Sequence, residues 1–354
     1  MRLGRRVTTA LLALAVAAVP LPTDAATAPS YVALGDSYSS GVGTRTYLAD
    51  GTTCQRSVYA YPSLIAAARG YALTFRACSG TTVANVRSSQ LSALGTGTAY
   101  VTISVGGNDA GFSSVLTECA KPGWLSSCNA AVDRAQAVIT GTLPASLHAL
   151  FASIRSLAPN AAVVVAGYPR LFNGEDCNLF TWFSPSEETR LNQTADLLDA
   201  RLGSAATAVG FSFANPTSAF VGHAVCGSPE WLNGLSYPVS ESYHPNRTGH
   251  ASGYTPLVGP RLTGAAVALT ASVLQAARAS ATTLAAQQRA YADLDSTIRP
   301  ERVRPVDLHS PRALRVAQRL GIDVNDRASV DAADRRWSAR QARAWERSVT
   351  RAAH

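Results

Sequence analysis

The stretch YVALGDSYSSGVG, residues 31–43, begins like a buried strand and then breaks into small, turn-forming residues around Ser37. Its first four residues are apolar, which is typical of a strand covered on both faces in a parallel sheet. In such sheets ligands gather at the carboxyl ends of the strands, where loops and helix N-termini point their N–H groups outward. A strand that stops at Gly35 and Asp36 therefore presents the Ser37 hydroxyl at the edge where chemistry takes place.

The same kind of patterning continues through residues 29–264. Continuously apolar, β-branched runs alternate with longer stretches compatible with helices, which favours a parallel sheet with helices on both faces. We therefore expect one domain with a three-layer α/β/α fold and about five central strands. The expected strands are residues 31–34, 72–77, 100–105, 162–166 and, with weaker patterning, 211–213, and the expected helices are residues 61–69, 130–157 and 185–209.

Residues 1–28 have the features of a cleaved export signal. Three arginines come first, an apolar run follows from about Val7, and small residues suited to signal-peptidase cleavage lie near residues 25–28. The apolar run is shorter than the roughly 20 residues that a membrane-spanning helix needs, which disfavours a membrane anchor. We therefore expect a secreted, extracellular protein.

Secretion changes how the six cysteines are interpreted, because an oxidising compartment favours disulfides over metal thiolates. Each consecutive pair of cysteines brackets one loop region between periodic segments. The spacing therefore predicts three sequential bridges, Cys54–Cys78, Cys119–Cys128 and Cys177–Cys226. The sequence contains no Cys-x-x-Cys or His-Glu-x-x-His spacing and its six histidines are scattered, so we expect neither a metal nor another cofactor.

The net charge of +8 lies outside the predicted domain. From Arg278 to the end the chain has 15 arginines and 9 acidic residues, and the export signal has 3 arginines and 1 aspartate. The remaining body has 13 basic and 13 acidic residues, which disfavours a nucleic-acid partner. The arginine-rich tail favours a transient association with an anionic membrane or cell-envelope surface.

Residues 265–354 form a C-terminal extension that is first alanine-rich and then arginine-rich. Residues 265–298 predict one long helix. Ser310 and Pro311 form a good N-cap and first-turn pair and Gly321 a good stop, so a helix is expected over 311–320, followed by another over 328–351. The extension is open to two interpretations, a small helical appendage or a largely disordered tail.

Three of the expected strands end in the residue types that acyl transfer needs, and a histidine follows late in the chain. Ser37, Gly80 and Asn108 follow the first three strands, and His244 lies in ESYHPNRTGH. A serine hydroxyl is a weak nucleophile until a base removes its proton, and neutral imidazole suits that task. The main-chain N–H groups of Ser37 and Gly80 and the Asn108 amide supply donors for an oxyanion.

This series resembles the SGNH hydrolase superfamily, also called GDSL esterases and lipases. The resemblance spans about residues 31–253, and the export signal and cysteine pairs resemble secreted actinobacterial members. It implies a flavodoxin-like three-layer fold with Ser37 as nucleophile, His244 as base, and Gly80 and Asn108 completing the oxyanion hole. The motifs that carry it are Gly35-Asp36-Ser37, Gly80, Gly106-Gly107-Asn108-Asp109 and His244, in this order. No Gly-x-Ser-x-Gly elbow occurs in the sequence, which argues against an α/β-hydrolase.

One position departs from the family pattern. Most members place an aspartate three residues before the histidine, and that position is Glu241 here. Some secreted actinobacterial relatives lack the aspartate and orient the histidine with a main-chain carbonyl. Three acceptors for the imidazole N–H therefore remain open, the Glu241 carboxylate, the Glu241 carbonyl and the Ser242 carbonyl, with a carbonyl preferred.

Several polar and aromatic residues near these motifs also have structural interpretations. Asp36 and Asp109 are expected to hold their turns by local hydrogen bonds, and His250 to be structural. The run NLFTWF at 178–183 is either an acyl-binding rim or core beneath its loop, and Trp124 and Trp231 share that ambiguity.

Together these features predict a secreted, metal-free serine hydrolase of carboxylic esters that works through an acyl-enzyme. Fatty-acyl esters, lipids or phospholipids are the expected substrates, and a monomer is expected. One alternative keeps the mechanism but removes acetyl groups from polysaccharide. An alternative of another class is a non-enzymatic protein that binds the cell envelope, with an inert hydrolase-like body.

Overall fold

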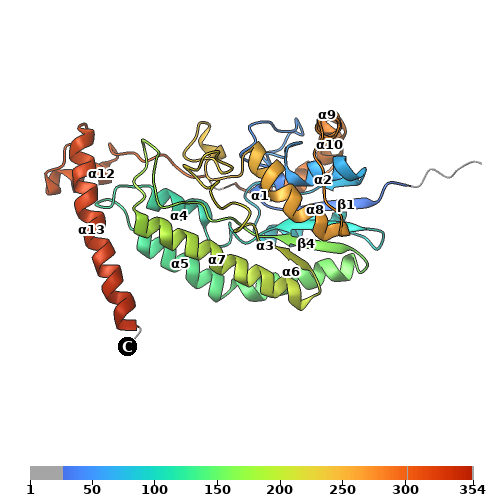
Figure 1. Cartoon of the computed structure of the whole chain (residues 1–354), viewed down its shortest axis with the longest axis horizontal. Helices are drawn as coiled ribbons and strands as arrows, with labels where there is room; N and C mark the ends of the chain where they lie inside the picture. Colours follow the sequence, from blue (N-terminus) through green and yellow to red (C-terminus); the bar gives the residue numbers. More distant parts are fainter. Residues whose placement is uncertain (1–26, 301, 353–354) are drawn as a thin grey trace, which may run out of the picture.

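The computed structural model describes residues 27–300 and 302–352 and centres on a five-stranded parallel sheet (Figure 1). The strands lie in the order β2-β1-β3-β4-β5, and all neighbours are parallel. The expected fold class is confirmed. The strand bounds are β1 Ser30–Gly35, β2 Ala72–Phe75, β3 Tyr100–Ser104, β4 Ala162–Ala166 and β5 Ser212–Ala214. The predicted export signal, residues 1–28, lies outside the described residues except for its last two positions.

The order of the strands reverses at β1. The two strands that follow β1 in the chain, β2 and β3, pair with its opposite edges. The connections on the two sides of β1 therefore diverge and leave a crevice at its carboxyl end, which is where open α/β sheets bind ligands. Ser37 lies two residues beyond the last residue of β1.

Helices cover both faces of the sheet. One face carries α4 Phe112–Cys119, α5 Cys128–Thr140, α6 Leu143–Leu157 and α7 Pro185–Ala208, and the other carries α2 Tyr61–Arg69 and α8 Thr255–Thr263. The single helix expected over residues 130–157 is wrong, because the chain breaks between α5 and α6. Pro144 lies in the first turn of α6, where main-chain N–H groups have no partner within the helix, so the missing N–H of proline costs no hydrogen bond. Within a continuous helix its ring would clash with the preceding turn.

The described residues of the extension form several helices that pack against the body. They are α9 Ala271–Ala279, α10 Ala281–Arg289, α11 Ala292–Asp295, α12 Pro311–Leu320 and α13 Arg327–Ala352. The single helix expected over residues 265–298 is wrong. The Ser280 hydroxyl donates to the Ala277 carbonyl at 2.7 Å, a local bond that competes with the helical main-chain pattern, and α9 ends at this point.

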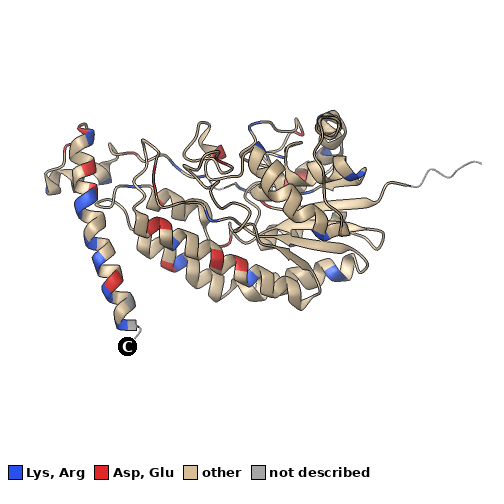
Figure 2. Cartoon of the chain, in the orientation of Figure 1, with Lys and Arg blue, Asp and Glu red and all other residues tan. Residues whose placement is uncertain are grey.

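The first and last parts of the extension lie at opposite ends of the molecule. α9 packs against α2 and α10 against the edge strand β2, whereas α12 and α13 lie at the other end, beyond α4 (Figure 1). α12 has the predicted bounds, because Ser310 caps its first turn and Gly321 ends it with φ at 64°. The long α13 carries many of the exposed arginines (Figure 2).

Three disulfides and several buried apolar clusters stabilise this arrangement. The structure joins Cys54 to Cys78, Cys119 to Cys128 and Cys177 to Cys226, which is the sequential pairing. The main core consists of the sheet and the helices on its two faces. A second cluster lies where α12 and α13 pack against Trp124 and Trp182.

The aromatic run at 178–183 divides between the surface and the interior. Trp182 and Phe183 are buried, while Leu179 and Phe180 are exposed. Trp231 is half-buried and stacks on the His223 ring at 3.8 Å between centroids. Among the described residues, no single helix has the length and apolarity to cross a membrane, and α5 with α6 meets that test only as a pair bent by 45°.

Candidate active site

The Gly-Asp-Ser turn leaves the Ser37 hydroxyl free of a capping role. α1 Ser37–Ser40 follows β1 directly, and Asp36 caps it by accepting a hydrogen bond from the Tyr38 N–H at 3.0 Å. Serine and aspartate are both preferred N-cap residues, and Asp36 takes that position here. The second Asp36 carboxylate oxygen accepts from the Tyr168 hydroxyl at 2.5 Å. Asp36 therefore has the local structural role expected of it.

His244 contacts Ser37 although 207 residues separate them in the chain. Its Nε2 lies 2.8 Å from the Ser37 Oγ, and its Nδ1 lies 2.8 Å from the Ser242 carbonyl oxygen. A carbonyl oxygen can only accept, so Nδ1 carries the proton and Nε2 is free to accept from the serine. Tyr243, with φ at 59°, makes the tight turn that brings the Ser242 carbonyl back to the ring.

The Glu241 carboxylate is engaged elsewhere. One oxygen accepts from the Gly43 N–H at 2.8 Å and the other from the Tyr47 hydroxyl at 2.5 Å. Of the three acceptors left open by the sequence, the Ser242 carbonyl is the one that lies at the imidazole, which agrees with the preference for a carbonyl, while the Glu241 carboxylate has other partners. Glu241 instead fixes the loop that follows α1.

Burial sets the protonation state of His244. Its side chain is 9% exposed, and desolvation lowers its pKa from 6.5 to about 4, partly opposed by the bond to the Ser242 carbonyl. The imidazole is thus neutral at pH 7, the form that can accept a proton. Tyr38 and Phe112 form its apolar surroundings, with ring centroids 5.3 Å and 6.0 Å from the imidazole.

Gly80 and Asn108 line the same cavity as Ser37 and His244. Gly80 follows β2 with φ at 84°, a left-handed conformation that glycine adopts without steric cost. The Asn108 side-chain amide donates to the Thr81 carbonyl at 2.9 Å, which fixes its orientation and leaves its second N–H available. All four predicted site residues are therefore brought together at the carboxyl ends of β1, β2 and β3.

Tyr168 connects two of these turns and is a residue that the sequence interpretation missed. Its hydroxyl donates to Asp36 and accepts from the Gly107 N–H at 3.3 Å. Tyr168 comes two residues after β4 ends, so the rule that strand ends carry functional residues would have found it. The Asp109 carboxylate accepts from the Val83 N–H at 3.1 Å, which joins the turn after β3 to the segment after β2.

An apolar cavity of about 70 Å³ adjoins the catalytic cavity. Phe112 lines both cavities, so its ring separates an apolar space from the serine. The apolar cavity lies between α4, α5 and α7, and its walls include Leu116, Ile139, Ala195 and Leu198. Such a space suits a hydrocarbon chain rather than a polar group.

Among the described residues, the one group whose metal-ligating atoms lie within reach of one another is Cys177, Cys226 and Glu230. Its two sulfur atoms are joined in a disulfide, so this group is not a metal centre. His250 is buried, and its Nδ1 accepts from the Tyr61 N–H at 3.3 Å, which is the structural role expected of it.

Comparisons with known proteins agree with this geometry. Residues 33–252 match the model of the GDSL-like lipase/acylhydrolase family. The chain belongs to this family. It is 41% identical over 249 residues to Lipase 1 of Streptomyces coelicolor, a match that covers 70% of this chain and 91% of that protein. Family membership makes the chain an ester hydrolase, which removes the alternative of a non-enzymatic binding protein.

Two solved structures are similar to the body of this family member. One is phospholipase A1 from Streptomyces albidoflavus, with 38% identity, a TM-score of 0.62 and coverage of 66% of this chain and 99% of that one. The other is an extracellular lipase from Streptomyces rimosus, with 40% identity, a TM-score of 0.62 and coverage of 66% and 100%. Both are therefore matched over nearly their whole length by two thirds of this chain.

Proposed function

We propose that Ser37 and His244 form a catalytic dyad that hydrolyses carboxylic esters through an acyl-enzyme. The observation that carries the proposal is the 2.8 Å contact between His244 Nε2 and Ser37 Oγ, with Nδ1 held by the Ser242 carbonyl. A nucleophile, a base and a group that orients the base are the three parts that activate a serine. Here the third part is a carbonyl dipole rather than a carboxylate.

The proton moves along this chain of contacts in both halves of the reaction. As Ser37 Oγ attacks the ester carbonyl carbon, its proton passes to His244 Nε2, which then gives it to the leaving alcohol. Water attacks the acyl-enzyme in the second half, and the imidazole takes its proton and returns it to Ser37. The other imidazole proton stays on Nδ1 throughout the reaction. Its hydrogen bond to the Ser242 carbonyl keeps the ring in one orientation.

The negative charge on the ester oxygen is held by three donors, the main-chain N–H groups of Ser37 and Gly80 and the free N–H of the Asn108 side chain. Their common position around one cavity supports this role. Loss of one such donor costs on the order of 3 to 4 kcal/mol of transition-state stabilisation. An Asn108→Ala variant therefore loses roughly 10² to 10³ in kcat.

The substrates are fatty-acyl esters, lipids or phospholipids rather than acetylated polysaccharide. The apolar cavity beyond Phe112 supports this choice, because an acetyl group has no chain to place there. The two solved relatives are named as a phospholipase A1 and a lipase. Comparing turnover of phospholipid with that of acetylated xylan tests the choice, and faster release of acetate from xylan would reverse it.

The protein acts outside the cell as a monomer. An export signal over residues 1–28, the three disulfides and the extracellular lipase among the relatives support this location. The exposed arginines of α13 support transient binding to an anionic envelope surface (Figure 2). Fractionation of a culture into medium and cells locates the protein, and retention of the uncleaved chain inside cells would contradict this location.

The dyad is tested with a fluorophosphonate, which labels an activated serine covalently. We expect labelling at Ser37 alone by peptide mass mapping, and loss of p-nitrophenyl ester hydrolysis in Ser37→Ala. Ser146→Ala, an exposed serine on α6, is the matched control and retains full activity. Labelling of another residue, or a Ser37→Ala variant with undiminished turnover, would contradict the dyad.

A further inference from the structure

The C-terminal extension crosses the face of the molecule that holds the catalytic residues. In Figure 1 the chain passes from α10 at one end, over the loops at the carboxyl ends of the strands, to α12 at the other end. We name the described residues 299–300 and 302–305 of this crossing the strap. The strap lies outside residues 33–252, to which the family model is matched.

The strap makes direct contact with the oxyanion glycine. A methyl group built on Gly80 would lie 2.4 Å from the Pro300 Cα and 2.9 Å from the Arg299 carbonyl oxygen. Those contacts are with the main chain of the strap, so they do not depend on a flexible side chain. The strap therefore packs against Gly80 as closely as a glycine permits.

Val303 and Arg302 form part of the wall of the catalytic cavity. Val303 is 6% exposed and belongs to the main apolar core, whereas Arg302 is exposed. The Arg304 N–H donates to the Thr117 hydroxyl on α4 at 3.0 Å. One buried valine and one hydrogen bond to α4 thus hold the middle of the strap in place.

With the strap docked, the catalytic cavity is too small for an ester. Its volume is about 20 Å³, which is enough for roughly one water molecule. Ser37 is 8% exposed and His244 9% exposed. An acyl group and an alcohol both have to reach the Ser37 Oγ in the proposed reaction, so this closed form excludes its own substrate.

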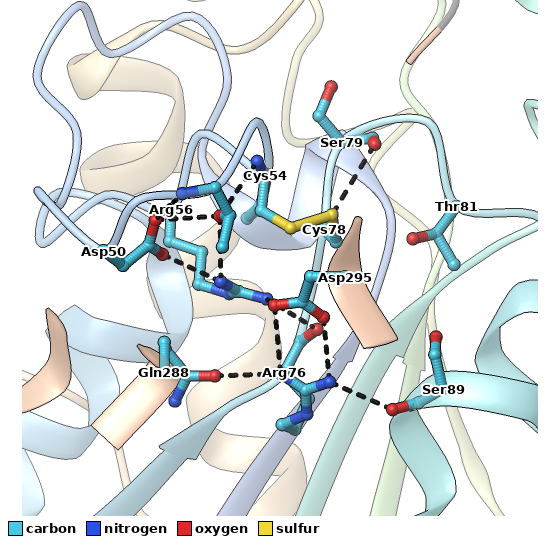
Figure 3. The surroundings of a disulfide bond; sticks show 12 residues. Asp50, Cys54, Arg56, Arg76, Cys78, Ser79, Thr81, Ser89, Gln288 and Asp295 are labelled. Atoms are coloured by element: carbon cyan, nitrogen blue, oxygen red, sulfur yellow. Dashed lines mark hydrogen bonds and ion pairs between the residues drawn. A yellow bond between two sulfur atoms is a disulfide. The ribbon is translucent and has the colours of Figure 1, made fainter. Parts of the chain in front are cut away.

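The chain before the strap is anchored in the body by buried ion pairs. Asp295 lies between Arg56 and Arg76, at 2.6 Å and 2.9 Å, and all three side chains are buried (Figure 3). Ile298 packs against the Cys54–Cys78 disulfide. Both arginines belong to the body, so the body and the extension share one buried charge cluster.

The chain after the strap is anchored at the other end of the molecule. The Trp182 indole N–H donates to Asp331 at 2.8 Å, and the Gly123 N–H donates to Asp334 at 2.6 Å, both on α13. Trp124 and Trp182 pack with α12 and α13 in the second apolar cluster. The first anchor has buried ion pairs and the second has an apolar cluster with two hydrogen bonds, whereas the middle of the strap has one buried valine and one hydrogen bond. The strap can therefore detach from the body while both anchors stay in place.

We propose that the strap is an intramolecular barrier, in which Val303 and Arg302 decide whether an ester reaches Ser37 and the enzyme works at its full rate only while the strap is displaced. The proposal rests on Ser37 as the reactive serine. A site that is open in only 1 to 10% of molecules shows an apparent affinity lowered by that fraction. Variants that undock the strap should therefore raise the measured rates.

The first test places a charge under the strap. Val303→Asp puts a carboxylate into the apolar core and favours the undocked strap. We expect fluorophosphonate labelling of Ser37 and kcat/KM for a p-nitrophenyl ester to rise at least tenfold relative to the full-length wild-type chain. Val221→Asp, the same substitution at an exposed valine, is the matched control and leaves both rates unchanged.

The second test leaves the strap sequence intact. Thr117→Val removes the hydroxyl that accepts from the Arg304 N–H, and we expect a severalfold rise in the same two rates. Thr140→Val is matched to it, because both threonines also donate to the carbonyl four residues earlier in their helix. This variant keeps the proposal testable if Val303→Asp fails to fold.

The outcomes separate the barrier from the proposed dyad. Equal labelling of Ser37 in wild type, Val303→Asp and Thr117→Val would overturn the barrier while keeping the dyad. Absence of Ser37 labelling in every folded variant would overturn the dyad itself. A merely structural strap predicts slower reactions in both variants, because loosening the wall would disturb the cavity rather than open it.

Discussion

At the scale of single residues, a main-chain carbonyl binds the imidazole of His244, the proposed base, and the Glu241 side chain has a different role. The Glu241 carboxylate binds the Gly43 N–H and the Tyr47 hydroxyl rather than the imidazole. We expect Glu241→Ala to keep kcat/KM within about tenfold of wild type. Loss of a true third member of a triad costs on the order of 10⁴, so a loss of that size in ester hydrolysis would contradict the assignment.

The pH dependence of the reaction follows from the buried base. The pKa of His244 is lowered to about 4, so the neutral form that accepts the serine proton is present above that pH and disappears as the pH falls through it. Around the ring lie the Ser242 carbonyl, Tyr38, Arg302 and His250, whose own pKa is lowered to about 3 by burial. Burial also raises the pKa of the Asp36 carboxyl, which directly precedes Ser37, to about 7. Its titration is therefore a second step of the pH profile, at a higher pH than that of His244.

We therefore expect kcat/KM of the full chain to fall on the acid side near pH 4. In Val303→Asp the strap is undocked and water reaches His244. The midpoint of the acid limb should therefore move up toward the ordinary histidine pKa of 6.5. A pH profile with a soluble ester measures both midpoints. Val221→Asp supplies the control, and identical midpoints in the two aspartate variants would show that the strap does not desolvate the base.

Much of the site at residue scale could be predicted, because each residue follows a recognisable strand or motif. Ser37, Gly80 and Asn108 lie two, five and four residues after the ends of β1, β2 and β3, and the structure places them with His244 around one cavity. The acceptor for the imidazole could not be predicted, because it depends on the left-handed turn at Tyr243. That turn involves a residue type that rarely adopts it, and nothing in the local sequence announces it.

At the scale of secondary structure elements, helix propensity predicted which segments are helical but not where a helix is interrupted. The alanine-rich segment 265–298 has strong helix propensity, yet α9, α10 and α11 divide it. Each piece meets a different partner, since α9 packs on α2 and α10 on β2, and a straight helix could not follow that surface. Tertiary packing therefore decides the breaks, which the sequence pattern does not contain.

The apolar cavity between α4, α5 and α7 gives a prediction about chain length. Ala195 on α7 lines that cavity away from Ser37, so Ala195→Phe fills space that an acyl chain would use. We expect turnover of a long-chain p-nitrophenyl ester to fall at least tenfold, while acetyl ester turnover stays within about twofold. Ala149→Phe on α6, an exposed alanine outside the lining, is the control, and an equal loss for both esters would remove the cavity from substrate binding.

At the scale of the whole molecule, the extension and the body are joined by shared buried charges. Asp295 is the carboxylate partner of Arg76 in the charge cluster of Figure 3. Removing one partner of a buried ion pair costs about 3 to 5 kcal/mol, because the remaining charge is left uncompensated. We expect Asp295→Asn to lower the free energy of unfolding in urea by that amount. Asp293→Asn, an exposed neighbour on α11, should change it by less than about 0.5 kcal/mol.

The position of the extension could not be predicted from its composition. The arginine content of the extension indicated a basic tail, and its helix signals indicated a small helical appendage. Neither feature shows that residues 299–300 and 302–305 cross the face that holds Ser37 and His244. The contacts involved are long-range, such as those between Arg76 and Asp295 or between Gly80 and Pro300. Such contacts depend on the assembled fold, and a single sequence has no periodic signal for them.

The charge of α13 gives the last prediction, which concerns the proposed binding to anionic membranes. α13 carries seven arginines and three acidic residues, and each arginine near an anionic membrane contributes about 1 kcal/mol to binding. We expect Arg340→Glu with Arg343→Glu to weaken binding to phosphatidylglycerol vesicles at least tenfold in a sedimentation assay at low salt. Arg134→Glu with Arg201→Glu makes the same change of net charge on exposed positions of α5 and α7. An equal loss in both pairs would mean that net charge, rather than α13, directs the enzyme to the surface, because a specific contact surface responds to where the charge lies.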